Sequence, residues 1–374
     1  MPSGLTLGTN GVLSGTSTQT GTQTFTAQVT DATGGTASQQ FTLTVTAPPL
    51  ATAWNVAAAR NADGSIALNW PTTNGGWYQV EFSTNLLNWT ILSNSTKAVS
   101  TSMTWTDDGL LTGTLPSSAT KRFYRVRNWG VFTVTFIGNN FTYTDAQRTV
   151  TGIFFKPAGT GPFPPLIINH GTGGTAGGFG LQRANEMSPW GLACIAANLT
   201  HMSGATQDLT TWGYSPENLA RIRACEAVLA TRSDVNLNRL SMWGHSRGAF
   251  ASIGVASDFG WELKALGFSA GGILDDTDLS EPSYPSVTEA SHIAAPTIMF
   301  HGSTDPVVPP ANSLRLQTLL NTIGVTNTRI VYDTTGISPT TDAHNIQNTH
   351  FYTDATTGIL DQWRAWLQAH GVLP

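Results

Sequence analysis

The stretch RLSMWGHSRGAFAS, residues 239–252, decides the fold. An apolar run ends at Gly244, Ser246 follows between two glycines, and small residues then continue in a pattern that suits a helix. A G-x-S-x-G motif becomes specific only between a strand and a helix, because its glycines permit the tight turn that exposes the serine hydroxyl. This context predicts that Ser246 is a nucleophile, and the alternative is a serine that only packs in a turn.

The surroundings of this motif, residues 131–374, alternate between apolar runs and amphipathic segments. Eight runs are typical of strands and four segments are typical of helices, one of which would begin with Ser215 as its cap and Pro216 in its first turn. The alternation predicts a mostly parallel eight-stranded sheet with helices on both faces. Because parallel strands end at one edge of a sheet, motifs that follow strands are expected to meet there.

Two later motifs follow predicted strands. The run FHGSTDPVVPP, residues 300–310, presents Asp305, and a carboxylate there can orient a histidine and stabilise its imidazolium form. The alternative is a turn aspartate before a proline. After the last predicted strand, both His344 and His350 precede the final helix. We expect His344 to be the base because it lies nearer the strand end, and His350 is the alternative.

The run NHGTGGTAGG, residues 169–178, is rich in glycine, so its backbone can approach a substrate oxygen closely. We predict that the backbone N–H groups of Thr172 and Arg247 form an oxyanion hole. The same run could cradle a phosphate, but no lysine completes such a motif.

Aromatic and acidic side chains occupy the loops around the predicted site. Trp212 and Tyr214 are candidates for substrate binding, and the long irregular loop at residues 273–296 could form one wall of the pocket. Asp275, Asp276 and Asp278 in that loop are too incomplete a pattern for a calcium site. No other spacing suits a metal, so we expect neither a metal nor a cofactor.

The first two segments differ in character from the third. Residues 1–47 alternate apolar and polar residues, and the runs PSGLTLGTNGVLSGTSTQT and TFTAQVTD resemble the Ig-like repeats of bacterial surface proteins. Residues 52–128 carry tryptophans at strand spacing and resemble a fibronectin-III-like β-sandwich. The alternative for that segment is a carbohydrate-binding module with exposed tryptophans. We therefore predict two small all-β sandwich modules before the third domain.

Residues 131–374 resemble the α/β-hydrolase superfamily, near the dienelactone hydrolases and secreted serine esterases. The matching motifs are His170-Gly171, the G-x-S-x-G motif and HGSTDPVVP, in this order. The resemblance implies acyl transfer to water through an ester on the serine. Cutinase-type polyester hydrolases are more distant, because they carry methionine where Arg247 stands and often a disulfide after the last strand, whereas no cysteine follows Cys225.

Composition limits the remaining possibilities. The 374 residues carry a net charge of -5 without a basic stripe, so nucleic acid is not an expected partner. No stretch approaches 18 uninterrupted apolar residues, so no membrane span is expected. Only 11% of the residues are charged. Cys194 and Cys225 are either two buried thiols or one disulfide. The low charge and the β-rich modules favour a secreted or cell-surface bacterial protein whose signal peptide was lost by truncation upstream of Met1.

These observations predict a secreted serine carboxylic ester hydrolase that uses Ser246, His344 and Asp305. Its ester substrate could be polymeric, either an acylated polysaccharide or an aromatic polyester, and the β-modules could contact a glycan. The alternatives are a polyester hydrolase of the polyethylene terephthalate type, a serine peptidase, and a surface adhesion protein without catalysis.

Overall fold

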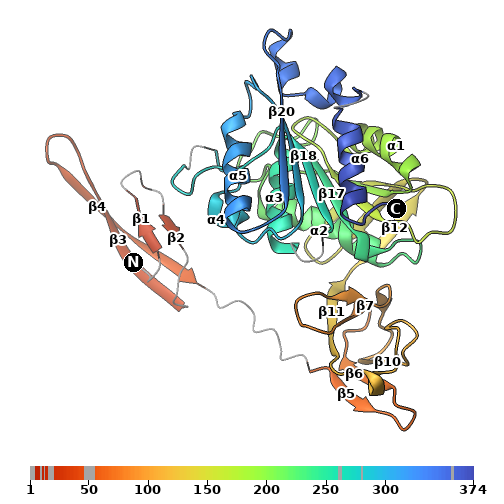
Figure 1. Cartoon of the computed structure of the whole chain (residues 1–374). Coiled ribbons are helices and arrows are strands. Elements are labelled where there is room, and N and C mark those ends of the chain that lie inside the picture. The colour runs from red at the N-terminus through yellow and green to blue at the C-terminus, as the bar shows by residue number, and fades with distance from the viewer. Residues whose placement is uncertain are drawn as a thin grey trace. The chain divides into compact units, whose positions relative to one another are not determined.

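The computed structural model places the chain in two compact units, residues 1–55 and residues 56–374 (Figure 1). We describe each unit by itself. The structure describes residues 5–8, 11, 13–15, 21–45, 55–259, 263–278, 281–354 and 358–374.

The first unit consists of two antiparallel hairpins within its described residues. Strand β1 (Leu5–Leu7) pairs with β2 (Leu13–Gly15), and β3 (Gly21–Thr30) pairs with β4 (Thr36–Val45). The side chain of Asp31 organises the turn between β3 and β4, since its Oδ1 accepts hydrogen bonds from the backbone N–H groups two and four residues later.

The second unit begins with a pair of small antiparallel sheets, which we call the two-sheet segment. Its strands are β5 (Ala57–Arg60), β6 (Ile66–Pro71), β7 (Gly76–Ser83), β8 (Thr90–Ile91), β9 (Thr96–Lys97), β10 (Ser102–Asp107) and β11 (Phe123–Val131). One sheet has the order β10-β6-β5 and the other has the order β11-β7-β8, with β9 also on β7. Trp70 and Tyr78, one from each sheet, are buried, as expected for strand aromatics that form a core.

The rest of the second unit surrounds one mixed sheet with the order β12-β13-β14-β16-β15-β17-β18-β19-β20. Strand β14 runs antiparallel to β16, and all neighbours from β16 to β20 are parallel. The bounds are β12 Thr133–Ile137, β13 Asn140–Thr144, β14 Thr149–Phe155, β15 Pro165–Asn169, β16 Ala193–Ala197, β17 Ser241–His245, β18 Ala265–Ser269, β19 Thr297–Gly302 and β20 Asn327–Tyr332.

The predicted count of eight strands is wrong, because this sheet has nine strands within the described residues. The additional strand is β13, which pairs with β12 on one side and β14 on the other. Its signal in the sequence is short: only Phe141 and Tyr143 alternate with polar residues, and both are buried. Gly138, with a φ of 59°, allows the tight turn that folds β13 back onto β12.

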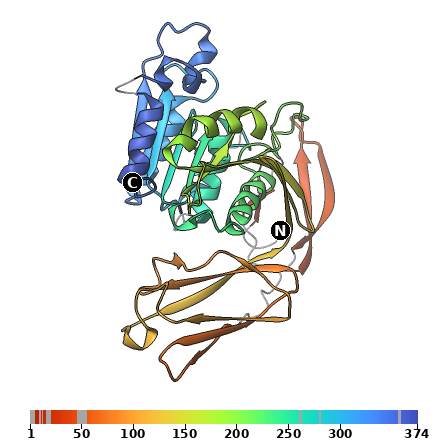
Figure 2. The same cartoon turned by 90° about the vertical axis from the view of Figure 1, so that its right-hand side faces the viewer.

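Helices cover both faces of this sheet (Figure 2). The described helices are α1 (Leu181–Met187), α2 (Pro216–Ala230), α3 (Arg247–Phe259), α4 (Val287–Ala290), α5 (Pro310–Thr322) and α6 (Ile359–Ala369). Side chains of α2, α3 and α5 share one buried apolar cluster, and side chains of α1 and α6 share the other. Ser215 caps α2 by accepting a hydrogen bond from the Asn218 N–H, as the sequence predicts.

This topology brings four loops to one edge of the sheet. The loops follow β15, β17, β19 and β20, and each contains a motif that the sequence analysis selects. Strands β15 to β19 are buried along their whole length, so they hold the four loops on a rigid base.

Candidate active site

Ser246 forms the turn between β17 and α3. Its φ is 54°, a left-handed value that is rare and strained for a residue with a side chain. Three backbone hydrogen bonds hold this conformation: the Ser246 N–H donates to the Ser269 carbonyl (3.1 Å), and the Ser246 carbonyl accepts from the N–H groups of Ala249 (2.8 Å) and Phe250 (3.2 Å). The turn therefore fixes the hydroxyl at the amino-terminal end of α3.

The positions on both sides of Ser246 require glycine, because neighbouring atoms leave no room for a Cβ there. A Cβ on Gly248 would lie 2.2 Å from the Asn169 carbonyl oxygen, and one on Gly244 would lie 2.5 Å from the Ser252 hydroxyl. A Cβ on Gly171 would lie 3.1 Å from the Cβ of Ser246. The loop after β15 therefore packs directly against the serine turn.

His344 joins Ser246 to Asp305. Its Nε2 lies 3.0 Å from the Ser246 Oγ, and its Nδ1 lies 2.9 Å from Oδ2 of Asp305. All three side chains are buried, with 6% to 7% of each residue exposed. A hydroxyl in this arrangement can pass its proton to the imidazole, while the carboxylate accepts from the opposite ring nitrogen.

Asp305 is held in its ionised form. Burial alone would raise the pKa of its carboxyl, but hydrogen bonds from His301 and His344 outweigh burial and lower this pKa well below its ordinary value. The backbone N–H groups of Val307 and Val308 add two hydrogen bonds to Oδ1, at 2.8 and 2.9 Å. Asp305 is thus a fixed acceptor for His344.

His350 occupies a different environment. It is exposed, and its ring lies 4.0 Å, between centroids, from the ring of Phe351. The structure therefore brings His344, and not His350, against Ser246 and Asp305.

Thr172 and Arg247 both line the pocket above Ser246. In the described part of the chain, neither of their backbone N–H groups has a hydrogen-bond partner. The loop before Thr172 rests on His170, whose ring bonds to the Gly171 carbonyl (2.8 Å) and accepts from the Leu199 N–H (3.0 Å). Burial lowers the pKa of His170 to about 4, so this support stays uncharged near neutral pH.

The pocket has a volume of about 620 Å³. Trp212 lines it and lies beneath the Arg247 guanidinium, 4.9 Å from ring centroid to Cζ. Tyr214 lies elsewhere, packed so tightly on α3 that a Cβ on Gly254 would come within 2.4 Å of its ring. The structure thus places Trp212 in the pocket and directs Tyr214 into the protein.

Glu281 and Ser283 complete a polar wall that the sequence did not single out by residue. The Arg247 Nη1 lies 2.5 Å from the Ser283 Oγ and 3.4 Å from Glu281, and the Ser283 hydroxyl donates to Glu281 at 2.8 Å. Glu281 and Tyr284 line the pocket, so the prediction that the loop at residues 273–296 forms a wall is confirmed. The available signal was this loop's length and position.

Arg183 is a further residue that sequence reasoning missed. It lies on α1, is 1% exposed, and donates to the carbonyl of Gln347 in the segment that follows His344. Its guanidinium lies 4.4 Å from the ring centroid of Tyr352, whose hydroxyl donates to Glu186 at 2.6 Å. Nothing in the sequence distinguishes this buried arginine from an exposed one on an amphipathic helix.

Other predictions concern groups outside the pocket. Cys194 and Cys225 are buried free thiols, which confirms the first of the two predicted alternatives. Asp275 and Asp276 accept hydrogen bonds from nearby threonines. Among the described residues no cluster of three or more His, Cys, Asp and Glu side chains is placed to hold a metal. In the same part of the chain, no helix has the length and apolarity to cross a membrane.

Comparison with known proteins gives the following similarities. Residues 1–46 match the family model described as "Putative Ig domain". No curated protein matches the chain. The structure is similar to a lipase/esterase from Lactobacillus plantarum (17% identity, TM-score 0.48, covering 65% of this chain and 100% of that chain). It is also similar to a dienelactone hydrolase-like promiscuous phosphotriesterase from metagenomic libraries (19% identity, TM-score 0.47, covering 65% of this chain and 98% of that chain). A third similar structure is acetyl xylan esterase 1 from a Thermoanaerobacterium species (15% identity, TM-score 0.44, covering 64% of this chain and 87% of that chain).

The chain thus carries an Ig-domain match over its first 46 residues, and its solved structural neighbours include dienelactone-hydrolase-like, esterase and acetyl xylan esterase α/β-hydrolases.

Proposed function

We propose that this protein is a serine carboxylic ester hydrolase that works through an acyl-enzyme. The observation that carries the proposal is the continuous hydrogen-bonded line from Ser246 through His344 to Asp305, at a left-handed turn that opens into a pocket. A packing serine would need neither the strained turn nor the histidine.

The proposed reaction begins when an ester carbonyl enters the pocket above Ser246. His344 Nε2 takes the serine proton as Oγ attacks the carbonyl carbon, and Asp305 stabilises the resulting imidazolium. The imidazolium returns the proton to the leaving alcohol. Water then attacks the acyl-serine with His344 again as base, which releases the carboxylic acid and restores the serine.

The negative oxygen of each tetrahedral intermediate would rest on the N–H groups of Thr172 and Arg247. Both residues line the pocket, neither N–H group has another partner among the described residues, and the Arg247 N–H lies at the positive end of α3. Removal of one such donor typically costs about 100-fold to 1,000-fold in kcat.

The pocket wall supports an acylated sugar as the substrate. Arg247 offers donors and Glu281 offers acceptors for hydroxyl groups, and Trp212 contributes an apolar ring to the same wall. An aromatic ester or polyester is the second candidate, because Phe250 and Tyr284 also line the pocket with rings 3.8 Å apart between centroids.

The test is hydrolysis of p-nitrophenyl acetate and butyrate by the wild type and three variants. Ser246→Ala and His344→Ala are expected to lose about 1,000-fold or more in kcat. His350→Ala is the matched control and is expected to retain full activity. An inactive but folded wild type would overturn the esterase proposal and bring forward a serine peptidase or a non-catalytic adhesion protein.

Substrate screening then separates the two ester classes. Acetylated xylan and feruloylated oligosaccharides represent the first class, and polyethylene terephthalate film represents the second. Release of acetate or ferulate without attack on the film supports the acylated polysaccharide. Release of terephthalate alone supports the polyester alternative.

We further propose that the enzyme is secreted or displayed on the cell surface, and that residues 52–128 and 131–374 are separate domains. The Ig-domain match at residues 1–46 supports the first proposal, because such modules suit extracellular proteins. The separate sheets of the two-sheet segment support the second.

A further inference from the structure

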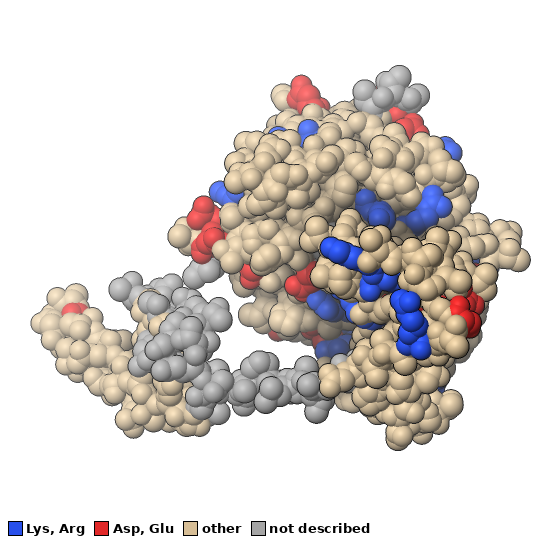
Figure 3. All heavy atoms as spheres, turned by 60° about the horizontal axis from the view of Figure 1, so that its bottom comes forward, with Lys and Arg blue, Asp and Glu red and all other residues tan. Residues whose placement is uncertain are grey.

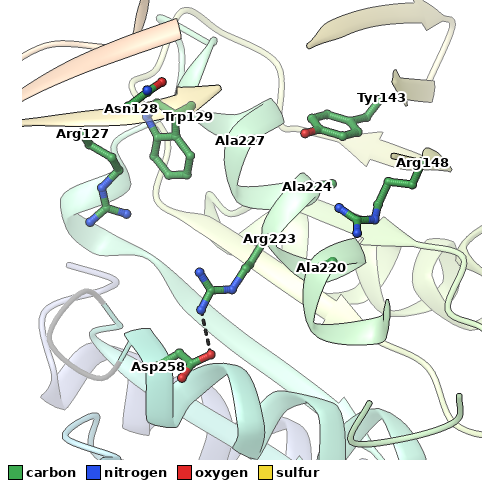
Figure 4. A pocket seen from close by; sticks show the side chains of 10 residues that line it. All are labelled: Arg127, Asn128, Trp129, Tyr143, Arg148, Ala220, Arg223, Ala224, Ala227 and Asp258. Carbon is green, nitrogen blue, oxygen red and sulfur yellow. Dashed lines mark hydrogen bonds and ion pairs between the residues drawn. The ribbon is translucent and has the colours of Figure 1, made fainter. Parts of the chain in front are cut away.

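A second cleft lies where the two-sheet segment meets α2 and α3. Its volume is about 450 Å³. Figure 4 shows Arg127 and Trp129 of β11 on one side, Tyr143 and Arg148 on the other, and Arg223 and Asp258 below them. None of these residues takes part in the proposed ester chemistry.

The space exists because α2 presents small side chains to it. Ala220, Ala224 and Ala227 lie on the same face of α2 and line the cleft. Larger side chains at these positions would fill the gap between β11 and α2, as apolar side chains do elsewhere in this core. The opening is therefore a consequence of three particular residues.

The walls carry more positive than negative charge. Three arginines line the cleft, and Asp258 is the one acidic residue among the described lining residues. Figure 3 shows Lys and Arg side chains gathered over the two-sheet segment and the adjoining part of the unit. The walls thus present more guanidinium groups than carboxylates, although each of the three arginines also contacts a carboxylate of the protein.

The ion pairs in the cleft can rearrange around a ligand. Arg223 lies 2.7 Å from Asp258, but both side chains are about half exposed (46% and 51%), and such surface pairs contribute little. Arg148 meets its carboxylates only at 3.4 and 3.5 Å, long distances for hydrogen bonds. An incoming carboxylate can therefore compete with Asp258 for Arg223, and with Asp145 and Glu217 for Arg148.

Trp129 brings an unsatisfied donor and a flat ring to the cleft. Its indole N–H is buried without a hydrogen-bond partner among the described residues, as are those of Trp70, Trp212, Trp243 and Trp363. The Arg127 guanidinium lies 4.9 Å from its ring centroid. A cleft that offers a free donor, flat rings and guanidinium groups suits a ligand with a carboxylate on a ring.

We propose that this cleft binds a ring-bearing carboxylate, in which Arg148 and Arg223 hold the carboxylate and Trp129 contacts the ring. Two sources share this chemistry: a uronic acid residue of a polysaccharide, and an aromatic carboxylic acid. The site is distinct from the ester pocket, because Arg247 and Asp258 are eleven positions apart on α3, about 16 Å along the helix axis.

The test is isothermal titration of the full chain with methyl glucuronide, with benzoate and with uncharged methyl glucoside. Arg223→Gln is expected to weaken binding of the carboxylate about tenfold, and Ala220→Leu is expected to abolish it by filling the cleft. Arg60→Gln and Ala369→Leu make the same changes at exposed positions outside the cleft and should bind as the wild type does.

The outcomes distinguish the two ligand sources from each other, and they also test whether the cleft binds a carboxylate at all. Binding of the glucuronide without benzoate assigns the site to an acidic sugar, and the reverse assigns it to an aromatic acid. The proposal is overturned if neither carboxylate binds, if methyl glucoside binds equally well, or if Ala220→Leu binds as the wild type does. Both cleft variants are expected to hydrolyse p-nitrophenyl acetate as the wild type does. The binding result therefore tests the cleft separately from the proposed esterase activity.

Discussion

At the scale of single residues, Glu226 is a buried carboxyl group in unfavourable surroundings. It lies on α2, is 3% exposed, and its Oε1 is 3.3 Å from Arg127 of the two-sheet segment. Burial raises its pKa from an ordinary 4.5 to about 7, even though Arg127 opposes this shift. Because the raised pKa belongs to the folded state, stability is lost as the pH rises from about 4.5 to 7.

Glu226→Gln is therefore expected to remove a pH-dependent penalty. The variant should gain stability relative to the wild type between pH 4.5 and 7.5, by up to about 3 kcal/mol, because a neutral amide pays no cost of ionisation in a buried site. Urea denaturation of both proteins at these two pH values measures the change. If the difference in free energy of unfolding between the two proteins were the same at both pH values, Glu226 would not be the group that loses stability on ionisation.

Sequence reasoning at this scale depends on what a motif can show. Ser246, Asp305 and His344 could be selected because each follows a predicted strand at an expected place. The sequence favoured His344 over His350 only by its nearness to the strand end, and the fold separates the two because only His344 contacts Ser246 and Asp305. Glu226 could not be selected, because a sequence does not show which charged residues of a helix become buried.

At the scale of elements, α1 holds the segment that carries the proposed base. Arg183 on α1 donates to the Gln347 carbonyl, three residues after His344, and is nearly inaccessible to solvent. Its guanidinium also stacks on Tyr352. We infer that α1 sets the position of His344 relative to Ser246, which makes Arg183 a positioning residue.

Replacement of Arg183 should therefore affect turnover more than substrate binding. Arg183→Met is expected to lower kcat about 10-fold to 100-fold with KM changed less than about twofold, because a small displacement of His344 lengthens the proton transfer. Steady-state kinetics with p-nitrophenyl acetate measures this split. Arg364→Met, which removes an exposed guanidinium near Trp190, is the control. Equal effects from both variants would argue against a positioning role.

The elements themselves were predicted unevenly. The buried parallel strands and α2 have long, distinct patterns, and the structure contains them. Strand β13 was missed because five residues give too little alternation to separate a strand from a turn. Tyr214 was placed near the substrate by its position in a loop, but its ring packs on Gly254, a contact that depends on the absence of a side chain there.

At the scale of the whole molecule, the two-sheet segment is bonded to the helical part of its unit. The Ser95 N–H donates to the Ala230 carbonyl at 2.9 Å, and Asn238 exchanges two hydrogen bonds with the backbone of Ile91. These contacts, with the Arg127–Glu226 pair, explain why residues 56–374 form one unit.

Two truncations should differ accordingly. Residues 56–374 alone are expected to keep the denaturation midpoint and the esterase activity of the full chain. Residues 132–374 are expected to lose stability, by roughly 3 kcal/mol from the three hydrogen bonds and more from apolar contacts. Urea denaturation followed by tryptophan fluorescence measures both. Equal midpoints for the two truncations would show that the segments are energetically independent.

The two buried thiols can report local unfolding on the two faces of the large sheet. Cys194 lies in the apolar cluster beside α1 and α6, and Cys225 lies in the cluster beside α2, α3 and α5. Each sulfur is shielded by a different layer, and burial raises the pKa of both thiols, so neither reacts with an alkylating reagent while its layer is closed. Pulsed alkylation followed by mass spectrometry would therefore time the opening of each side of the sheet separately, without any introduced label.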